Sequence, residues 1–148
     1  MTTIIDTHLE SLGTYLKTRL NEAGAALSTP LIVVDDVTYL TDFNPIDKFP
    51  LLQVYRTGGK GWSDETQEWE INYCLTNYAD PYDVPRILAW VVESHNPENI
   101  RVLLVNYFSS TQCNGLRLDI ESISWSYGYK ILGANKVPSL RVSFTLLS

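Results

Sequence analysis

The segment of residues 67–78, QEWEINYCLTNY, decides the expected fold. Its apolar and polar side chains alternate strictly. The apolar set is Trp69, Ile71, Tyr73 and Leu75, and the set between them is Glu68, Glu70, Asn72 and Cys74. A period of two over this length predicts a β-strand with one buried face and one face that meets solvent or a partner.

The strands expected around this segment are shorter or interrupted. Residues 49–56 predict a strand, and two short strands are expected at 31–34 and 37–40. Residues 115–125 alternate again, but the apolar phase changes from even to odd positions at Ile123. A change of phase by one residue predicts a β-bulge at this point.

The final strand is predicted by the alternation of residues 140–146. Its inward residues are Leu140, Val142, Phe144 and Leu146. We expect them to face the core and to pack against the first helix. Glycine and polar residues predict two connections: a protruding hairpin loop at 57–64 and a long polar segment at 128–138.

An amphipathic helix of about 20 residues is predicted near the start of the sequence. Its apolar residues recur at steps of three and four: Ile5, Leu9, Leu12, Leu16, Leu20, Ala23 and Leu27. A second helix is expected at Asp83, which can cap it, with Pro85 in the first turn. Residues 100–108 are compatible with a third helix or a strand, because their apolar spacing is helical but includes β-branched valines.

The predicted order is therefore one helix, several strands, one or two helices and two strands. Because helices and strands are segregated along the chain, the sequence predicts an α+β fold. We expect a mostly antiparallel β-sheet packed against an N-terminal helix and one or two further helices. The 148 residues suit a single domain that spans 1–148.

The composition disfavours two classes of partner. Eleven Lys and Arg against 17 Asp and Glu give a net charge of -6. This balance disfavours sequence-independent binding of nucleic acid and docking on anionic lipid. The sequence has no apolar run of ~18 residues, so no membrane span is expected. The two cysteines, Cys74 and Cys113, are expected to be reduced thiols.

No motif predicts catalysis. We therefore expect that the protein is not an enzyme, and we expect no catalytic, cofactor-binding or metal-binding residues. The two histidines, His8 and His95, lack metal-ligand spacing. The segment TGGKG at 57–61 lacks the glycine spacing of a phosphate loop and the Ser or Thr after its lysine. A cysteine nucleophile is only weakly indicated, because neither cysteine has a histidine near it in the sequence.

Three pairs of residues are candidates for a protein interface. They are Lys60 and Trp62 in the glycine-rich loop, Glu68 and Glu70 on the polar face of the central strand, and Arg141 and Thr145 on the outward face of the final strand. Loop aromatics often anchor interfaces, but Trp62 is equally compatible with folding back over the sheet. Trp125 and Tyr127, at the expected bulge, are the other aromatic residues that suggest a contact.

The layout resembles that of bacteriophage tail terminator proteins, also called tail completion proteins. The N-terminal amphipathic helix and the strand FPLLQVYR at 49–56 carry part of the resemblance. The hairpin strand that contains WEINYCL at 69–75 and runs to DPYD at 80–83, just before a helix, carries the rest. A closing pair of strands completes the layout, and the resemblance covers nearly the whole chain.

The resemblance implies a structural virion protein without enzymatic activity. Such proteins form a ring, usually a homohexamer, that caps the tail tube, ends tail elongation and forms the joint to the head-side connector. The implied partners are further copies of this chain, the tail tube protein, the connector or neck protein and, in contractile tails, the sheath protein. DNA passes through without specific binding, and assembly takes place in the host cytoplasm. Two alternatives remain open: another neck or connector subunit, and a non-viral small binding or regulatory module.

Overall fold

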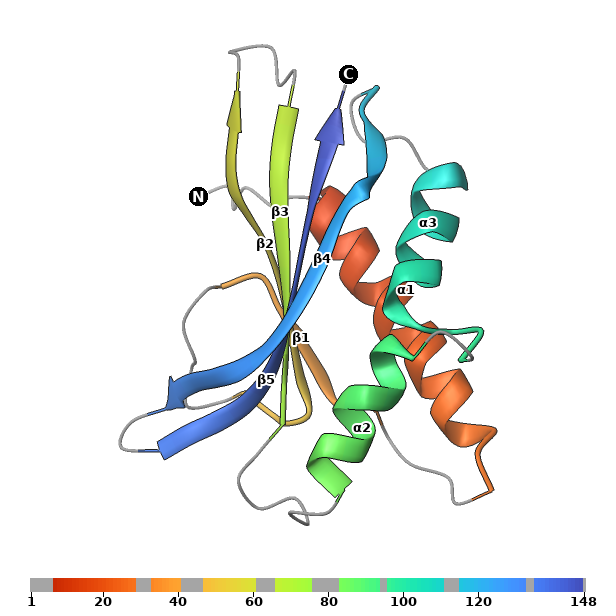
Figure 1. Ribbon diagram of the computed structural model, residues 1–148, viewed down its shortest axis with the longest axis vertical. Helices are drawn as coiled ribbons and strands as arrows, with labels where there is room; N and C mark the ends of the chain where they lie inside the picture. Colours follow the sequence, from red (N-terminus) through yellow and green to blue (C-terminus); the bar gives the residue numbers. More distant parts are fainter. Residues whose placement is uncertain are drawn as a thin grey trace, which may run out of the picture.

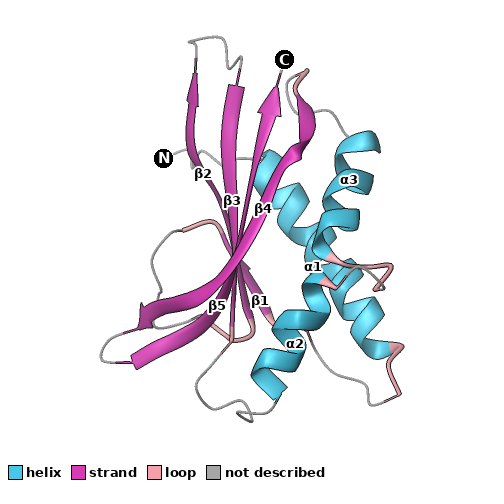
Figure 2. Cartoon of the chain, in the orientation of Figure 1, coloured by secondary structure: helices cyan, strands magenta, loops and turns pink. Residues whose placement is uncertain are grey.

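The computed structural model describes residues 7–28, 33–40, 47–60, 66–75, 83–93, 96–110, 115–132 and 135–147. Within these ranges, three helices lie on one face of a five-stranded sheet (Figures 1 and 2). The helices are α1 (Thr7–Ala25), α2 (Asp83–Val92) and α3 (Ile100–Ser110). The strands are β1 (Asp36–Thr38), β2 (Leu51–Lys60), β3 (Thr66–Cys74), β4 (Arg117–Leu132) and β5 (Asn135–Leu147). This is the α+β class that the segregation of helices and strands predicted.

The sheet has the strand order β1-β2-β3-β5-β4. β1 is parallel to β2, and the other neighbouring strands are antiparallel. β3, the strand predicted by the alternation at 67–78, lies in the centre of the sheet. Each of its residues from Thr66 to Cys74 has a register partner in both β2 and β5. Its predicted continuation beyond Leu75 lies outside the described residues.

The main core lies between the sheet and the helices. The inward residues predicted for the central and final strands are all buried: Trp69, Ile71, Tyr73, Leu75, Leu140, Val142, Phe144 and Leu146. The stripe of α1 is buried at Leu9, Leu12, Leu16 and Leu20. Full burial of one such side chain stabilises the fold by roughly 1.5–3 kcal/mol, so these two sets anchor the helices to the sheet.

The helix that packs against Phe144 of β5 is not the one predicted. The ring of Phe144 packs against Trp69 and against Phe108 of α3, with centroids 5.8 and 5.7 Å away. α1 was expected to cover this strand, but it lies against β1 and β2. α1 approaches β1 closely at Gly13, where an added Cβ would lie 2.8 Å from Val37 Cγ1. The close approach therefore requires a residue without a side chain.

The largest correction concerns residues 128–138, which the sequence predicted as a polar connection. Their described part belongs instead to two paired strands, with 128–132 in β4 and 135–138 in β5, and Gly128 pairs with Ser139. Nothing lies within 4 Å of a Cβ added at Gly128, so this glycine is not explained by close contact. The alternation of large apolar residues with small or polar ones continues through it, as a strand requires.

The loop expected at 57–64 is also shorter than predicted. β2 continues to Lys60 and remains paired with β3, with a shift of register just after Arg56. A Cβ added at Gly59 would lie 2.9 Å from the carbonyl oxygen of Thr66. Close approach of the two strands therefore explains this glycine better than a turn does. The rest of the expected loop lies outside the described residues.

Polar side chains decide the structure at the start of α3. Residues 100–110 form a helix, which resolves the choice between helix and strand. Asn99 caps it, because its Oδ1 accepts a hydrogen bond from the backbone N–H of Val102 at 2.9 Å. The cap and the burial of the apolar face of α3 thus stabilise the helix, although this segment contains β-branched valines.

An irregularity is present near Ile123 as predicted, but it is longer than the predicted one-residue β-bulge, because the five steps from Asp119 to Ser124 face only two steps along β5. The register of β4 against β5 shifts between Asp119 and Ser124. Ser122 fills the gap in the ladder, since its hydroxyl donates to the carbonyl oxygen of Asp119 at 2.6 Å and accepts from the N–H of Thr145 at 2.8 Å. The backbone groups that the bulge separates are therefore bridged by a side chain.

The short strand expected at 31–34 is not formed by its described part, Val33 and Val34. Asn21 of α1 holds this segment instead. Its Oδ1 accepts from the N–H of both valines at 2.8 Å, and its Nδ2 donates to the carbonyl oxygen of Val34 at 2.7 Å. An asparagine thus replaces the strand pairing that the valines suggested.

Candidate interaction surface

The face of the sheet that points away from the helices, here called the open face, is mainly polar. Four predicted interface residues lie on it. They are Glu68 and Glu70 of β3, and Arg141 and Thr145 of β5. Glu68 stands directly opposite Thr145 in the register, and Lys60 stands opposite Thr66 at the end of the same face. Pleating places Glu68, Glu70, Arg141 and Thr145 on this side, because their sequence neighbours belong to the core. Lys60 shares this side because its register partner Thr66 lies two residues from Glu68 on the same strand.

A hydrogen-bonded cluster occupies the middle of the open face. The hydroxyl of Tyr55 donates to Glu70 Oε2 and accepts from Asn72 Nδ2. Asn72 Nδ2 also lies 3.1 Å from Glu70 Oε2, and Arg141 Nε lies 3.7 Å from Glu70 Oε1. The Glu70 side chain is only 15% exposed. These three partners therefore compensate for the water that its carboxylate loses on burial.

The same cluster changes the acidity of its tyrosine. Burial, and then the hydrogen bond to Glu70, raise the pKa of Tyr55 well above its usual value. Tyr55 therefore remains a neutral phenol that donates a hydrogen bond. It holds the carboxylate in place and does not act as a base at neutral pH.

Lys130 of β4 connects the hairpin to the open face. Its Nζ donates to Gln53 Oε1 at 2.6 Å and lies 5.9 Å from the centre of the Tyr55 ring. The thiol of Cys74 lies beneath, 3.9 Å from Gln53 Oε1. Burial raises the pKa of Cys74 to about 12. The thiol is therefore protonated at neutral pH and unsuited to nucleophilic attack.

An apolar stripe on β4 is the second notable surface. We define the hairpin stripe as four residues, with their exposed fractions: Trp125 (52%), Tyr127 (49%), Tyr129 (68%) and Ile131 (65%). Their partners Val142 and Leu140 point toward the helices, so the stripe lies on the helix side of the sheet. It is exposed because the hairpin curves away beyond the helices (Figure 1).

The base of the hairpin stripe is less exposed than its outer part. The rings of Trp125 and Tyr127 pack together with centroids 5.1 Å apart. Burial and the nearby carboxylate of Glu93 raise the pKa of Tyr127. Tyr129 and Ile131 are the more exposed members. The outer part of the stripe is thus the part most available to a partner.

The backbone of β4 is available as well. Among the described strands, β4 pairs only with β5 and forms one edge of the sheet. A long apolar edge strand is a surface on which another chain can pack or pair. The hairpin therefore combines unpaired backbone groups with large exposed side chains.

The sequence identified part of this surface. Trp125 and Tyr127 were recognised, but Tyr129 and Ile131 were assigned to a connection. Continuing the alternation past Gly128 would have found both. The Tyr55 cluster carries no such signal, because the contact with Glu70 depends on the register between two strands. Two expected residues, Trp62 and Cys113, lie outside the described residues.

The described side chains include no group of three or more His, Cys, Asp or Glu that could hold a metal ion. No helix in the described ranges is long and apolar enough to cross a bilayer. A comparison with models of known protein families finds no match, and a comparison with curated proteins finds none either. The function is therefore argued from the two surfaces, the open face and the hairpin stripe.

Proposed function

We propose that this protein is a structural subunit that assembles into a ring, as bacteriophage tail terminator proteins do. In this role the ring caps the tail tube, ends its elongation and joins it to the head-side connector within the virion. A homohexamer is the expected form. The hairpin stripe is the observation that carries the proposal, because it needs a partner to cover it.

The size of the hairpin stripe supports self-assembly. Four large apolar side chains, each 49% exposed or more, lie within seven residues of one edge strand. Completing their burial would contribute roughly 4–7 kcal/mol per contact. A micromolar complex corresponds to about 8 kcal/mol. The stripe would therefore supply much of the free energy needed, before the cost of association is counted.

The open face supports the rest of the proposal. At its centre, Glu70 is held by Tyr55, Asn72 and Arg141. Polar groups held in fixed positions can set the orientation of a partner protein without adding a large apolar contact area. Glu68, Arg141 and Thr145 are proposed to contact a neighbouring subunit or the tail tube. The net charge of -6 suits a ring through which DNA passes without being bound.

Sedimentation velocity of the purified chain at micromolar concentration tests the proposal. A species of several subunits, with six expected, and annular particles in negative-stain electron microscopy would support it. A chain that remains monomeric to the highest accessible concentration would contradict self-assembly. That result would favour a small binding or regulatory module.

Addition of the ring to tail tubes that lack a terminator tests the specific role. The tubes are expected to bind the ring at one end and to stop growing. An unchanged distribution of tube lengths, with no ring bound, would favour a different neck or connector subunit.

A further inference from the structure

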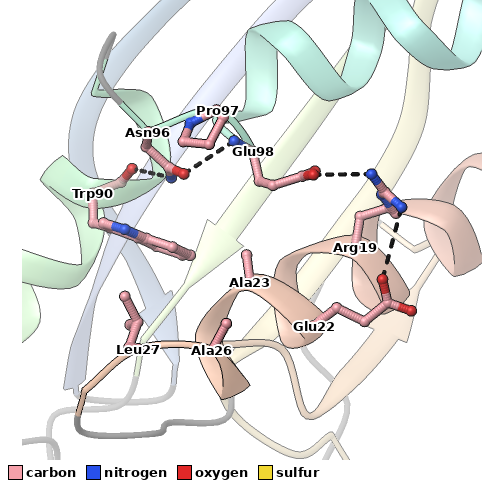
Figure 3. A pocket seen from close by; sticks show the side chains of 9 residues that line it. All are labelled: Arg19, Glu22, Ala23, Ala26, Leu27, Trp90, Asn96, Pro97 and Glu98. Atoms are coloured by element: carbon pink, nitrogen blue, oxygen red, sulfur yellow. Dashed lines mark hydrogen bonds and ion pairs between the residues drawn. The ribbon is translucent and has the colours of Figure 1, made fainter.

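A hollow of about 540 Å³ lies between the C-terminal end of α1 and the connection from α2 to α3. Figure 3 shows Trp90 facing Ala23, Ala26 and Leu27 across it. We call this site the α1–α2 hollow. These residues make the walls of the α1–α2 hollow mainly apolar, as is usual for binding pockets.

The charged rim of the hollow is firmly positioned. Arg19 Nη2 donates to Glu98 Oε1 at 2.9 Å, and its Nη1 lies 3.8 Å from Glu22 Oε2. Asn96 fixes the opposite side, because its Nδ2 donates to the carbonyl oxygen of Trp90 and its Oδ1 accepts from the N–H of Glu98. Glu22 is 64% exposed. The rim thus carries two carboxylates and one guanidinium, a net charge of -1, and the Glu22 carboxylate is its most exposed charged group.

The hairpin has the complementary chemistry. Residues 125–139 contain two lysines, Lys130 and Lys136, and no carboxylate. Lys136 pairs with Ile131, so it lies on the same face as the hairpin stripe, and it is exposed. In a chain with a net charge of -6, a basic apolar hairpin is attracted to an acidic rim, whereas two average surfaces repel each other.

The two features lie at opposite sides of the molecule. In Figure 1 the paired ends of β4 and β5 project to the lower left, whereas α2 and the end of α1 lie to the lower right. A projection on one side and a matching hollow on the other produce a heterologous, head-to-tail contact. Such contacts generate a ring when the rotation between neighbours closes.

We propose that the outer part of the hairpin stripe of one copy docks in the α1–α2 hollow of the next copy. Tyr129 and Ile131 occupy the apolar hollow, and Lys136 lies beside Glu22. This contact rests on the proposed ring function and deepens it, since it names the two surfaces that join neighbouring subunits.

Two substitutions at exposed positions separate the two halves of the contact. Ala26→Trp fills the hollow, and Tyr129→Asp removes the anchor and adds a negative charge. Each is expected to weaken self-association by at least about 30-fold, as loss of a binding hot spot does. Ser124→Asp is the matched control, because it adds the same charge at an exposed position of β4 on the other face of the strand, opposite Ser143. Circular dichroism checks that all variants fold.

The decisive measurement mixes the two defective variants. Ala26→Trp keeps an intact hairpin, and Tyr129→Asp keeps an intact hollow. Their mixture can therefore form one native contact per pair. Sedimentation velocity is expected to show monomers for each variant alone, 1:1 dimers and nothing larger for the mixture, and the wild-type mass for Ser124→Asp.

Failure of this contact is distinguishable from failure of the ring. If the wild-type chain forms an oligomer that persists in both variants, the hairpin–hollow contact is wrong and the ring stands. If both variants are monomeric and their mixture forms no dimer, the two surfaces are not each other's partners. If the wild-type chain is itself monomeric, both the contact and the proposed function are overturned.

Discussion

Replacing Phe144 with alanine is expected to lower the free energy of unfolding by about 3–5 kcal/mol. The side chain is only 2% exposed, and its ring packs against Trp69 and Phe108. Truncation removes apolar burial and leaves a cavity between the sheet and α3. It also breaks two ring contacts, each worth roughly 0.5–1.5 kcal/mol beyond the buried area. A loss of this size is a large share of the stability of a typical domain, about 5–15 kcal/mol.

Urea unfolding followed by tryptophan fluorescence measures the loss. All variants are compared at one protein concentration, because assembly adds stability that depends on concentration. The matched control is Ser143→Ala, one residue away on the open face, which is expected to change stability by less than about 0.5 kcal/mol. Phe144→Leu should give an intermediate loss, because it keeps part of the buried surface.

Two results would refute the reasoning in different ways. A loss below about 1 kcal/mol for Phe144→Ala would mean that this ring is not part of a packed core. Equal losses for Ser143→Ala and Phe144→Ala would mean that the faces of β5 are exchanged. A shift of one residue moves every side chain of a strand to the opposite face.

Two further variants test the open face. Tyr55→Phe should lower the free energy of unfolding by about 1–2 kcal/mol, because Glu70 and Asn72 lose a hydrogen-bond partner; an unchanged urea midpoint would contradict the cluster. Cys74→Ala tests the pKa of about 12. The folded state holds this proton more tightly than the unfolded chain, so the wild-type advantage over the variant is complete below about pH 8.5 and falls toward pH 12, by at most about 1.4 kcal/mol per pH unit. A difference in stability that stays constant over this range would contradict the shift.

The core-facing residues of β3, β5 and α1 were predictable because their signal is local. Burial of one face imposes a period of two on a strand and of about 3.6 on a helix. The burial of Trp69, Phe144 and Leu16 can therefore be predicted from the local pattern, without knowing which residues they contact. The irregularity near Ile123 was predictable for the same reason, since a bulge shifts the phase of a local pattern.

The errors share a different physical origin. Gly59 was assigned to a protruding loop and Gly128 to a long connection, but both lie in paired strands. The valines at 33–34 favoured a strand, but Asn21 takes up their hydrogen bonds. In each case pairing or hydrogen bonding with another segment of the chain outweighs the preference of the single residue. The candidate cluster around Tyr55 could not be predicted either, because register between strands is a tertiary property.

The two ends of β4 differ in a way that restricts where a partner can bind. Near Asp119 the strand bulges, and Ser122 bridges the separated backbone groups. A bulge twists an edge strand and hinders its pairing with another chain. Beyond the bulge the ladder with β5 continues without a shift from Ser124 to Leu132, and this is where the hairpin stripe lies. The edge is thus irregular at the bulge and regular and apolar beyond it, so the proposed association would favour one defined contact at the hairpin over pairing along the whole strand.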